Sequence, residues 1–340
     1  MSNSSLIAKV TEEAVLSYFR SSIKHLILHV TGKCNMSCRH CFISAGTFKE
    51  DLSLDEIKAI AKALPDLIWL DIGGGEPLLR DDLEDIIALF NFRELSIPTN
   101  GWDTGSIFKK VKGINSRASG RLIVTLSLDG MQKTHDEIRC PGSFERTVQT
   151  FNKLREVRGL RIKFNTVLCE KNCDEIPDLM CFVKKLEPDF HSILKLRGSP
   201  RDPSMKLPPL EKIEALEREA NHIQKSYGYG RTGLLSKVQR NYQKYKGDLN
   251  IRILREKKQV IPCLAGASHL VIWPEGSVSP CELLPPVGNI RKKNLKELLN
   301  GVEMKKAISS IRKGSCFCTH DCNMIENILF NLRSYSRLLW

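Results

Sequence analysis

The stretch HLILHVTGKCNMSCRHC, residues 25–41, joins an apolar run typical of a buried β-strand to a loop with three closely spaced cysteines, Cys34, Cys38 and Cys41. Thiolates at these spacings can converge on one iron–sulfur cluster. Zinc is the competing occupant, although zinc sites usually take paired CxxC units and four ligands. Three cysteines with no fourth nearby would leave one iron free for an outside ligand, so this loop is a candidate site for chemistry.

Five further short apolar runs follow the first one at regular spacing, and helical patterns separate them. The pattern SLDEIKAIAKAL begins with a capping box from Ser53 to Glu56 and repeats apolar residues at helical spacing. Six βα units predict an α/β fold, a partial (β/α)6 TIM-like barrel with a parallel sheet, whose chemistry lies at the C-terminal ends of the strands. The expected strands are 25–31, 67–72, 94–99, 121–127, 161–168 and 189–196.

The remaining chain has different compositions on either side of residue 260. Residues 199–260 begin with four prolines and then look mainly helical and basic, whereas 261–325 are rich in Cys, Gly and Pro. We therefore expect a helical bridge followed by a small cysteine-rich domain. The expected divisions are an N-terminal helical segment 1–24, the barrel 25–198, the bridge 199–260, the cysteine-rich domain 261–325 and a tail 326–340.

Composition indicates a soluble globular protein, because charged residues make up 27% and apolar residues 41% of the 340 residues. No apolar run is long enough for a membrane helix, and the N-terminus has no pattern of an export signal. We therefore expect a cytoplasmic protein without a membrane span. Eight of the 12 cysteines fall in two clusters, which in a reducing cytosol indicate metal binding rather than disulfides, and the other four are expected to be structural.

The formal net charge of +13 is concentrated in residues 195–258, which hold 16 Lys/Arg and 7 Asp/Glu. The same stretch contains Tyr227, Tyr229, Tyr242 and Tyr245. Such a patch could attract phosphate, a nucleotide, an acidic peptide or nucleic acid. The alternative is a helical bridge with a solvated basic face.

Polar turns close the second, third and fourth expected strands. Gly74-Gly75-Glu76-Pro77 closes the second, where glycines let backbone come close and a carboxylate can meet an ammonium group. Thr99-Asn100-Gly101 and Ser127-Leu128-Asp129-Gly130 close the next two. With Cys-x3-Cys-x2-Cys after the first strand, this ordered set resembles the radical S-adenosylmethionine (radical SAM) superfamily over about residues 24–197.

The resemblance implies a [4Fe–4S] cluster whose open iron binds the amino and carboxylate groups of S-adenosylmethionine (SAM). One electron from the cluster then cleaves SAM to a 5′-deoxyadenosyl radical, and a reduced flavodoxin or ferredoxin-type protein is the implied donor. His40 takes the position before the third cysteine, where the family usually has an aromatic residue near the adenine. Lys195 and Arg197 are candidates on the substrate side. The implied cofactor-binding residues are His40, Gly74, Gly75, Glu76, Pro77, Asn100, Ser127, Asp129, Asn165 and Arg197.

The later cysteines form a second group. Cys263-x12-Gly276-x4-Cys281 is followed by Cys316-x-Cys318-x3-Cys322, which resembles the SPASM/twitch extensions of radical SAM enzymes. The resemblance implies an auxiliary [4Fe–4S] cluster on Cys263, Cys281, Cys318 and Cys322, with Cys316 as the alternative ligand. His320 is either a ligand or packed in a turn. Spacing alone does not separate this site from a zinc knuckle.

The leading interpretation is an enzyme that abstracts a hydrogen atom from a small anionic molecule or a peptide, for oxidation, crosslinking, epimerisation or rearrangement. A non-catalytic iron–sulfur carrier or sensor would leave the ordered GGEP, TNG and SLDG elements unexplained. A zinc-stabilised nucleic-acid binder would leave the six βα units unexplained. The sequence does not identify the substrate.

Overall fold

The computed structural model describes residues 22–339 except 44–47, 49, 226 and 228–232. The predicted N-terminal helical segment 1–24 therefore lies almost wholly outside the described residues, as does Tyr229.

Six parallel strands form the predicted part of the sheet, in sequence order from β1 to β6. Their bounds agree with the predicted runs to within two residues, and this confirms the expected α/β fold with a parallel sheet. The GGEP turn begins inside a strand, because β2 continues to Gly74. The strands are β1 His25–Thr31, β2 Leu67–Gly74, β3 Phe92–Thr99, β4 Arg121–Ser127, β5 Arg161–Leu168 and β6 Phe190–Lys195.

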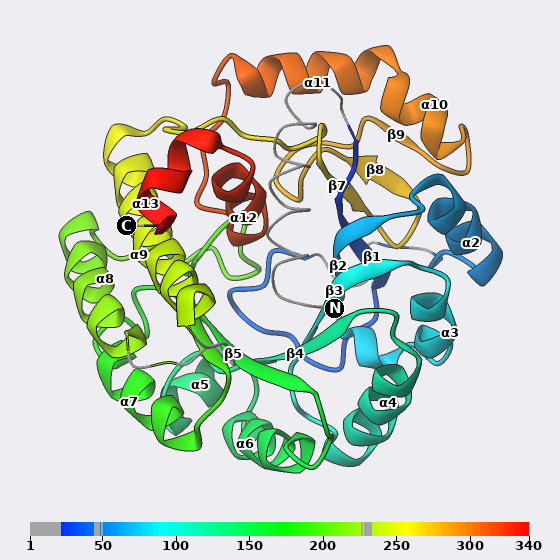
Figure 1. Cartoon of the computed structure of the whole chain (residues 1–340). Helices are drawn as coiled ribbons and strands as arrows, with labels where there is room; N and C mark the ends of the chain where they lie inside the picture. Colours follow the sequence, from blue (N-terminus) through cyan, green and yellow to red (C-terminus); the bar gives the residue numbers. More distant parts are fainter. Residues whose placement is uncertain (1–21, 44–47, 49, 226, 228–232, 340) are drawn as a thin grey trace.

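Helices cover one face of these strands and form the outer ring in Figure 1. The predicted capping box is present in α2, where Ser53 and Glu56 each accept a hydrogen bond from the other residue's backbone N–H. A continuous apolar core lies between the strands and the ring. The helices are α2 Leu54–Ala63, α3 Leu83–Ala88, α4 Thr104–Arg117, α5 Gln132–Ile138, α6 Ser143–Leu154, α7 Ile176–Leu186 and α8 Leu210–Gln224, with the 3-10 turn η1 Pro77–Leu79 before α3.

The cysteine-rich segment does not form a separate sheet. Strand β7 (His269–Ile272) pairs in parallel with β1, and β8 (Ser277–Ser279) and β9 (Gly288–Asn289) continue outward, so that one sheet runs β6-β5-β4-β3-β2-β1-β7-β8-β9. The physical reason is that β1 would otherwise present an unpaired backbone edge. The sequence-based division into separate barrel and C-terminal units did not anticipate this shared sheet.

The bridge contains α8 and the long helix α9 (Gly233–Glu256). Residues 326–339, expected to form a tail, instead complete α12 (Asp321–Leu329) and form η2 (Leu332–Ser334) and α13 (Tyr335–Leu339). Apolar side chains of α12, α13 and α9 share a cluster, and Figure 1 shows α12 between α9 and β7. Helices α10 (Leu295–Asn300) and α11 (Val302–Arg312) lie beyond β9. Among the described helices, none is long and apolar enough to cross a membrane.

Candidate functional site

The three early cysteines lie on the loop after β1, at the C-terminal end of the strands. Their thiols are close enough to affect one another, since Cys38 and Cys41 both contribute to the pKa of Cys34. Burial raises the pKa of Cys34 to about 11 and also raises that of Cys38. These two thiols therefore carry protons at neutral pH without a metal, and binding a cluster must release them.

The GGEP turn packs directly on this cysteine loop. Gly75 donates its N–H to the Thr31 carbonyl at 2.9 Å, and Glu76 donates to the Lys33 carbonyl at 2.8 Å. A Cβ on Gly75 would lie 2.1 Å from the Lys33 oxygen, and Gly74 has a φ of +135° that side chains rarely adopt. Both glycines are therefore required by the close approach that the sequence predicted.

Glu76 connects the second and third strand ends. Its carboxylate is buried and accepts backbone N–H groups of Leu78 at 3.2 Å and Asn100 at 2.8 Å. Burial raises its pKa to about 7, so an adjacent cation would favour the ionised form. Asn100 in turn donates its side-chain N–H to Asn35 on the cysteine loop at 2.7 Å. The predicted residues Glu76 and Asn100 thus share one hydrogen-bonded unit with that loop.

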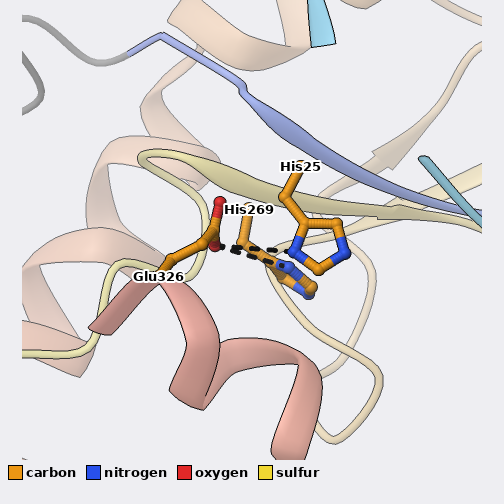
Figure 2. Close-up of side chains that lie close together, drawn as sticks. All are labelled: His25, His269 and Glu326. Carbon is orange, nitrogen blue, oxygen red and sulfur yellow. Dashed lines mark ion pairs between the residues drawn. The ribbon is translucent and has the colours of Figure 1, made fainter. Parts of the chain in front are cut away.

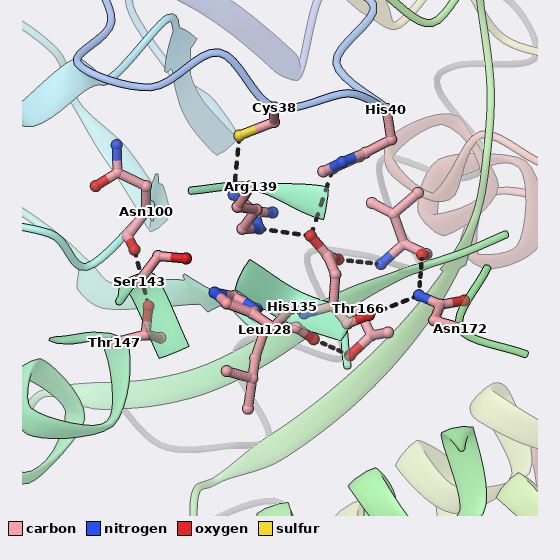
Figure 3. A network of polar contacts seen from close by, with 12 residues as sticks. Cys38, His40, Asn100, Leu128, His135, Arg139, Ser143, Thr147, Thr166 and Asn172 are labelled. Carbon is pink, nitrogen blue, oxygen red and sulfur yellow. Dashed lines mark hydrogen bonds and ion pairs between the residues drawn. The ribbon is translucent and has the colours of Figure 1, made fainter. Parts of the chain in front are cut away.

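A buried ion pair links the fourth strand end to Cys38, and Figure 3 shows its cation, Arg139, beside Cys38. Asp129 is fully buried and accepts Arg139 Nε at 2.5 Å and the Val167 N–H at 2.7 Å. Burial opposes its ionisation, but the charge of Arg139 holds the pKa of Asp129 below its ordinary value. The Arg139 Nη1 then lies 3.7 Å from Cys38 Sγ. Asp129 therefore orients a cation toward the cysteine loop.

Arg139 was not among the site residues predicted from the sequence. It follows α5 and belongs to none of the strand-end motifs, so only the folded chain brings it to Asp129 and Cys38. Its side chain is 8% exposed and fixed at the guanidinium, so it offers a positive charge beside the thiols without a large loss of side-chain entropy.

Three other predicted residues carry polar atoms without partners. His40 is buried beside Asp129, and burial lowers its pKa to about 4, so the ring is neutral at pH 7. Ser127 and Asn165 are register partners on β4 and β5. The buried atoms His40 Nδ1, Asn165 Oδ1 and Arg197 Nε have no hydrogen-bond partner in the part of the chain that the structure describes. Such atoms fit a polar ligand bound at this end of the strands.

Lys195 and Arg197 have different surroundings, although both were expected on the substrate side. Lys195 is the register partner of Leu168, which packs in the core between sheet and helices, and its ammonium pairs with Glu217 of α8. The substrate-side prediction for Lys195 is therefore wrong, because alternate strand residues face opposite sides. Arg197 instead lies over the Phe42 ring at 4.9 Å and pairs with Glu282 at 3.3 Å.

Four of the five later cysteines form one group. Cys316 and Cys318 both influence the pKa values of Cys263 and Cys281, which burial raises to about 11 and about 12. The Cys322 thiol donates a hydrogen bond to Asp71, and burial keeps the pKa of Cys322 well above its ordinary value. The structure therefore groups Cys316 with Cys263, Cys281 and Cys318, whereas the Cys322 thiol is directed to a carboxylate.

The spacing of these thiols bears on the choice between zinc and a cluster. Four thiolates about 2.3 Å from one tetrahedral zinc ion would lie about 3.8 Å apart. Within the described chain, no three cysteine sulfurs lie within 4.8 Å of one another. This arrangement is compatible with a cluster, in which iron and sulfide atoms separate the thiolates.

Glu282, next to Cys281, connects the two cysteine groups. Its buried carboxylate pairs with Arg197 at 3.3 Å, with His29 of β1 at 3.1 Å and with His320. Burial opposes ionisation, but His320, His29 and Arg197 hold the pKa of Glu282 well below its ordinary value. His320 is therefore bonded to a carboxylate through Nε2, which favours the packing role over cluster ligation.

Comparison with protein families agrees with this geometry. The radical SAM superfamily model matches residues 28–183, and the iron–sulfur cluster-binding domain SPASM matches residues 263–323. The chain belongs to the radical SAM superfamily. This radical SAM protein is therefore an enzyme that binds SAM at a [4Fe–4S] cluster and carries an auxiliary cluster, which decides against the electron-carrier and nucleic-acid-binding alternatives.

Curated relatives of this radical SAM enzyme are diverse. GTP 3′,8-cyclase of Peptoclostridium acidaminophilum is 27% identical over 67% of this chain and 77% of that protein. The AdoMet-dependent heme synthase of Nitratidesulfovibrio vulgaris is 25% identical over 81% of this chain and 78% of that protein. The antilisterial bacteriocin subtilosin biosynthesis protein AlbA of Bacillus subtilis is 27% identical over 81% of this chain and 59% of that protein.

Two solved structures share the fold. SuiB of Streptococcus suis, bound to its precursor peptide SuiA, has a TM-score of 0.64 at 17% identity and covers 89% of this chain and 70% of SuiB. The enzyme anSMEcpe, with bound AdoMet and the Cp18Cys peptide, has a TM-score of 0.61 at 16% identity. The match covers 93% of this chain and 96% of anSMEcpe. At these identities the likeness supports the partial-barrel fold alone.

Proposed function

We propose that the enzyme cleaves SAM reductively and uses the resulting 5′-deoxyadenosyl radical to remove a hydrogen atom from a substrate that carries an anionic group. The main observation behind this proposal is that the cysteine loop lies among the polar C-terminal ends of the strands. Among the described residues, His40, Asn165 and Arg197 carry buried polar atoms without hydrogen-bond partners. We propose Cys34, Cys38 and Cys41 as the ligands of the SAM-binding cluster.

The surrounding side chains suit the charges of the cofactor. The proposed partner of its ammonium group is Glu76, whose buried carboxylate is held by two backbone N–H groups. The proposed partner of its carboxylate is Arg139, held by Asp129 beside Cys38. We assign the adenosine part to His40, Asn100, Ser127 and Asn165, while Gly74, Gly75 and Pro77 shape the turn. In this arrangement Asp129 orients Arg139 rather than binding the cofactor itself.

Substituting Arg139 tests this assignment. We expect Arg139→Gln to weaken SAM binding by about tenfold to a hundredfold, because a hydrogen bond to a charged group contributes about 1.5–3 kcal/mol. Isothermal titration of the anaerobic, reconstituted enzyme measures the affinity. Arg155→Gln is the matched control, since Arg155 lies after α6 over the Phe151 ring and is exposed. Equal SAM affinity in the two variants would contradict the assignment of Arg139 to the cofactor site.

The substrate's anionic group is assigned to Arg197. This side chain lies between the Phe42 ring and Glu282, and its Nε is buried without a partner, so it can still donate to a carboxylate or phosphate. Two relatives support different carriers of such a group, since the name of GTP 3′,8-cyclase includes a nucleotide and AlbA is a bacteriocin biosynthesis protein. Between these two carriers we favour a peptide, because AlbA aligns with 81% of this chain and GTP 3′,8-cyclase with 67%.

The sequence suggested that the basic bridge could attract an anionic partner, but the structure gives less support for a role in substrate binding. Among its described cations, Lys212, Lys246 and Arg255 pair with Asp174, Asp321 and Glu214. These pairs favour the interpretation of a helical bridge with a solvated face. The net charge of +13 is suited to an acidic electron donor, and we propose a reduced flavodoxin or ferredoxin-type protein.

The proposed function is tested by following the hydrogen atom. The reconstituted enzyme is reduced with dithionite and given SAM, and 5′-deoxyadenosine is measured by mass spectrometry. Peptide and small-molecule fractions from cells grown in deuterated medium are then added separately. We expect deuterium in 5′-deoxyadenosine with the peptide fraction. Deuterium with the small-molecule fraction alone would overturn the peptide assignment, and absence of 5′-deoxyadenosine would overturn the reaction.

A further inference from the structure

A second group of buried polar residues lies at the opposite end of the strands from the cysteine loop. His25 is the first residue of β1, His269 is the first residue of β7, and the two are register partners. Glu326 reaches them from α12, as Figure 2 shows. The group therefore joins three elements that are far apart in sequence: the start of the barrel, the cysteine-rich segment and the C-terminal helices.

Three potential ligand atoms converge here. Glu326 Oε2 lies 3.9 Å from His25 Nδ1 and 3.7 Å from His269 Nδ1. Within the described residues, this is the one group of three or more His, Cys, Asp or Glu side chains whose ligand atoms all lie within 4.8 Å of one another. All three residues are at most 1% exposed, so bulk water does not separate them.

Among the described residues, these three atoms have no hydrogen-bond partner, and only the longer ion-pair contacts join them. His25 Nδ1, His269 Nδ1 and Glu326 Oε2 are all buried without a hydrogen bond. Their separations exceed hydrogen-bond length, so the side chains do not satisfy one another directly. Burial also raises the pKa of Glu326 to about 7 and lowers that of His269 well below its ordinary value. A buried polar atom without a hydrogen bond costs about 1–3 kcal/mol, and here three such atoms lie close together.

The outer atoms of the same side chains are held in place. His25 Nε2 lies 3.1 Å from Asp71 Oδ2, and Glu326 Oε1 accepts a hydrogen bond from Ser268 Oγ at 2.9 Å. A carboxylate on the far nitrogen of a histidine is the usual support of a metal ligand, because it fixes the tautomer that leaves the other nitrogen free. His25 thus has the supporting partner that a ligating histidine requires.

We propose that His25, His269 and Glu326 bind a divalent transition-metal ion, with Zn²⁺ as the probe, at a site separate from both iron–sulfur clusters. Two imidazole nitrogens and one carboxylate oxygen are ligands that such ions accept. Ligands about 2.0 Å from one tetrahedral ion lie about 3.3 Å apart, so the two separations between Glu326 and the histidines need to close by about half an ångström.

The position of the site gives the ion a structural role. Helix α12 follows the Cys316–Cys318 loop and packs on α9, and Glu326 would tie it to the paired strands β1 and β7. The ion would thereby hold the auxiliary-cluster loop against the barrel. The cysteine loop after β1 lies at the other end of that strand, so the ion has no place in SAM cleavage.

Metal analysis of the anaerobic, fully reconstituted enzyme tests the site. Because a [4Fe–4S] cluster holds equal iron and acid-labile sulfide, total iron plus zinc minus sulfide counts metal outside the clusters. After incubation with Zn²⁺ and desalting, we expect about one excess metal ion per chain in the wild type. We expect less than a tenth of that in Glu326→Gln and His269→Asn, and about a tenfold to hundredfold weaker zinc affinity in Asp71→Asn.

His191→Asn is the matched control, since His191 is equally buried but bonds to Thr166 behind the sheet. It should keep the excess ion. Zinc-edge X-ray absorption of the wild type provides a measurement that does not depend on variants folding. We expect nitrogen and oxygen ligands near 2.0 Å without sulfur. No excess metal in the wild type, equal retention in Glu326→Gln, or sulfur in the zinc shell would overturn the proposal.

Discussion

Replacing any one of Cys34, Cys38 and Cys41 by alanine is expected to abolish release of 5′-deoxyadenosine from SAM. The [4Fe–4S] cluster needs all three thiolates to leave a single open iron. Among the described residues, the side chains that hold the loop are amides, carboxylates and Arg139, and no further cysteine belongs to this group. The loss should therefore be complete rather than partial.

Iron analysis and a product assay check this expectation together. The wild type should contain about eight irons per chain, and each of the three variants about four. Cys181→Ala is the control, because Cys181 is exposed on α7 and far along the chain from either cysteine group. A variant of the triad that retains both its iron and nucleoside release would contradict the ligand assignment.

The second large effect concerns Cys316 and Cys322, which the prediction from sequence ranked in the opposite order, with Cys322 as a ligand and Cys316 as the alternative. We expect Cys316→Ala to lose about four irons, as Cys263→Ala and Cys281→Ala should, and Cys322→Ala to retain about eight. The reason is that Cys263, Cys281, Cys316 and Cys318 influence one another, whereas the Cys322 thiol is directed to Asp71.

Activity provides a second measurement for the auxiliary site. Cys263→Ala should still release 5′-deoxyadenosine, because its thiol lies apart from the cysteine loop, but it should stop conversion of the substrate. Loss of iron in Cys322→Ala with full iron in Cys316→Ala would reverse the assignment and restore the ligand set expected from sequence. If none of these variants loses iron, the second cysteine group has no cluster.

Both effects depend on a division of labour along the chain. We propose that residues 25–198 cleave SAM, that 199–260 form a supporting bridge and that 261–325 hold the auxiliary cluster. Glu282 and Arg197 connect the first and last of these parts. Because β7 extends the barrel's own sheet, the two cluster sites are held by one set of backbone hydrogen bonds rather than by a flexible linker.

Local features of this enzyme were determined by the sequence itself. The six strands, the capping box at Ser53 and the glycines of the GGEP turn depend on neighbouring residues or on the conformations open to one residue type. The cysteine spacing belongs to the same class, because ligands on one short loop need no distant partner. Such features are readable because their physical cause lies within a few residues.

Only the tertiary structure decided which side each strand residue faces and which distant groups meet. Alternate residues of a strand face opposite sides of the sheet, but in β6 both of these sets mix apolar and polar residues. The sequence therefore did not reveal that Lys195 faces the helices. Arg139 beside Cys38, Cys316 in place of Cys322, and Glu326 facing His25 depend on contacts across tens to hundreds of residues. Register and long-range packing create these contacts, and neither leaves a periodic signal in the chain.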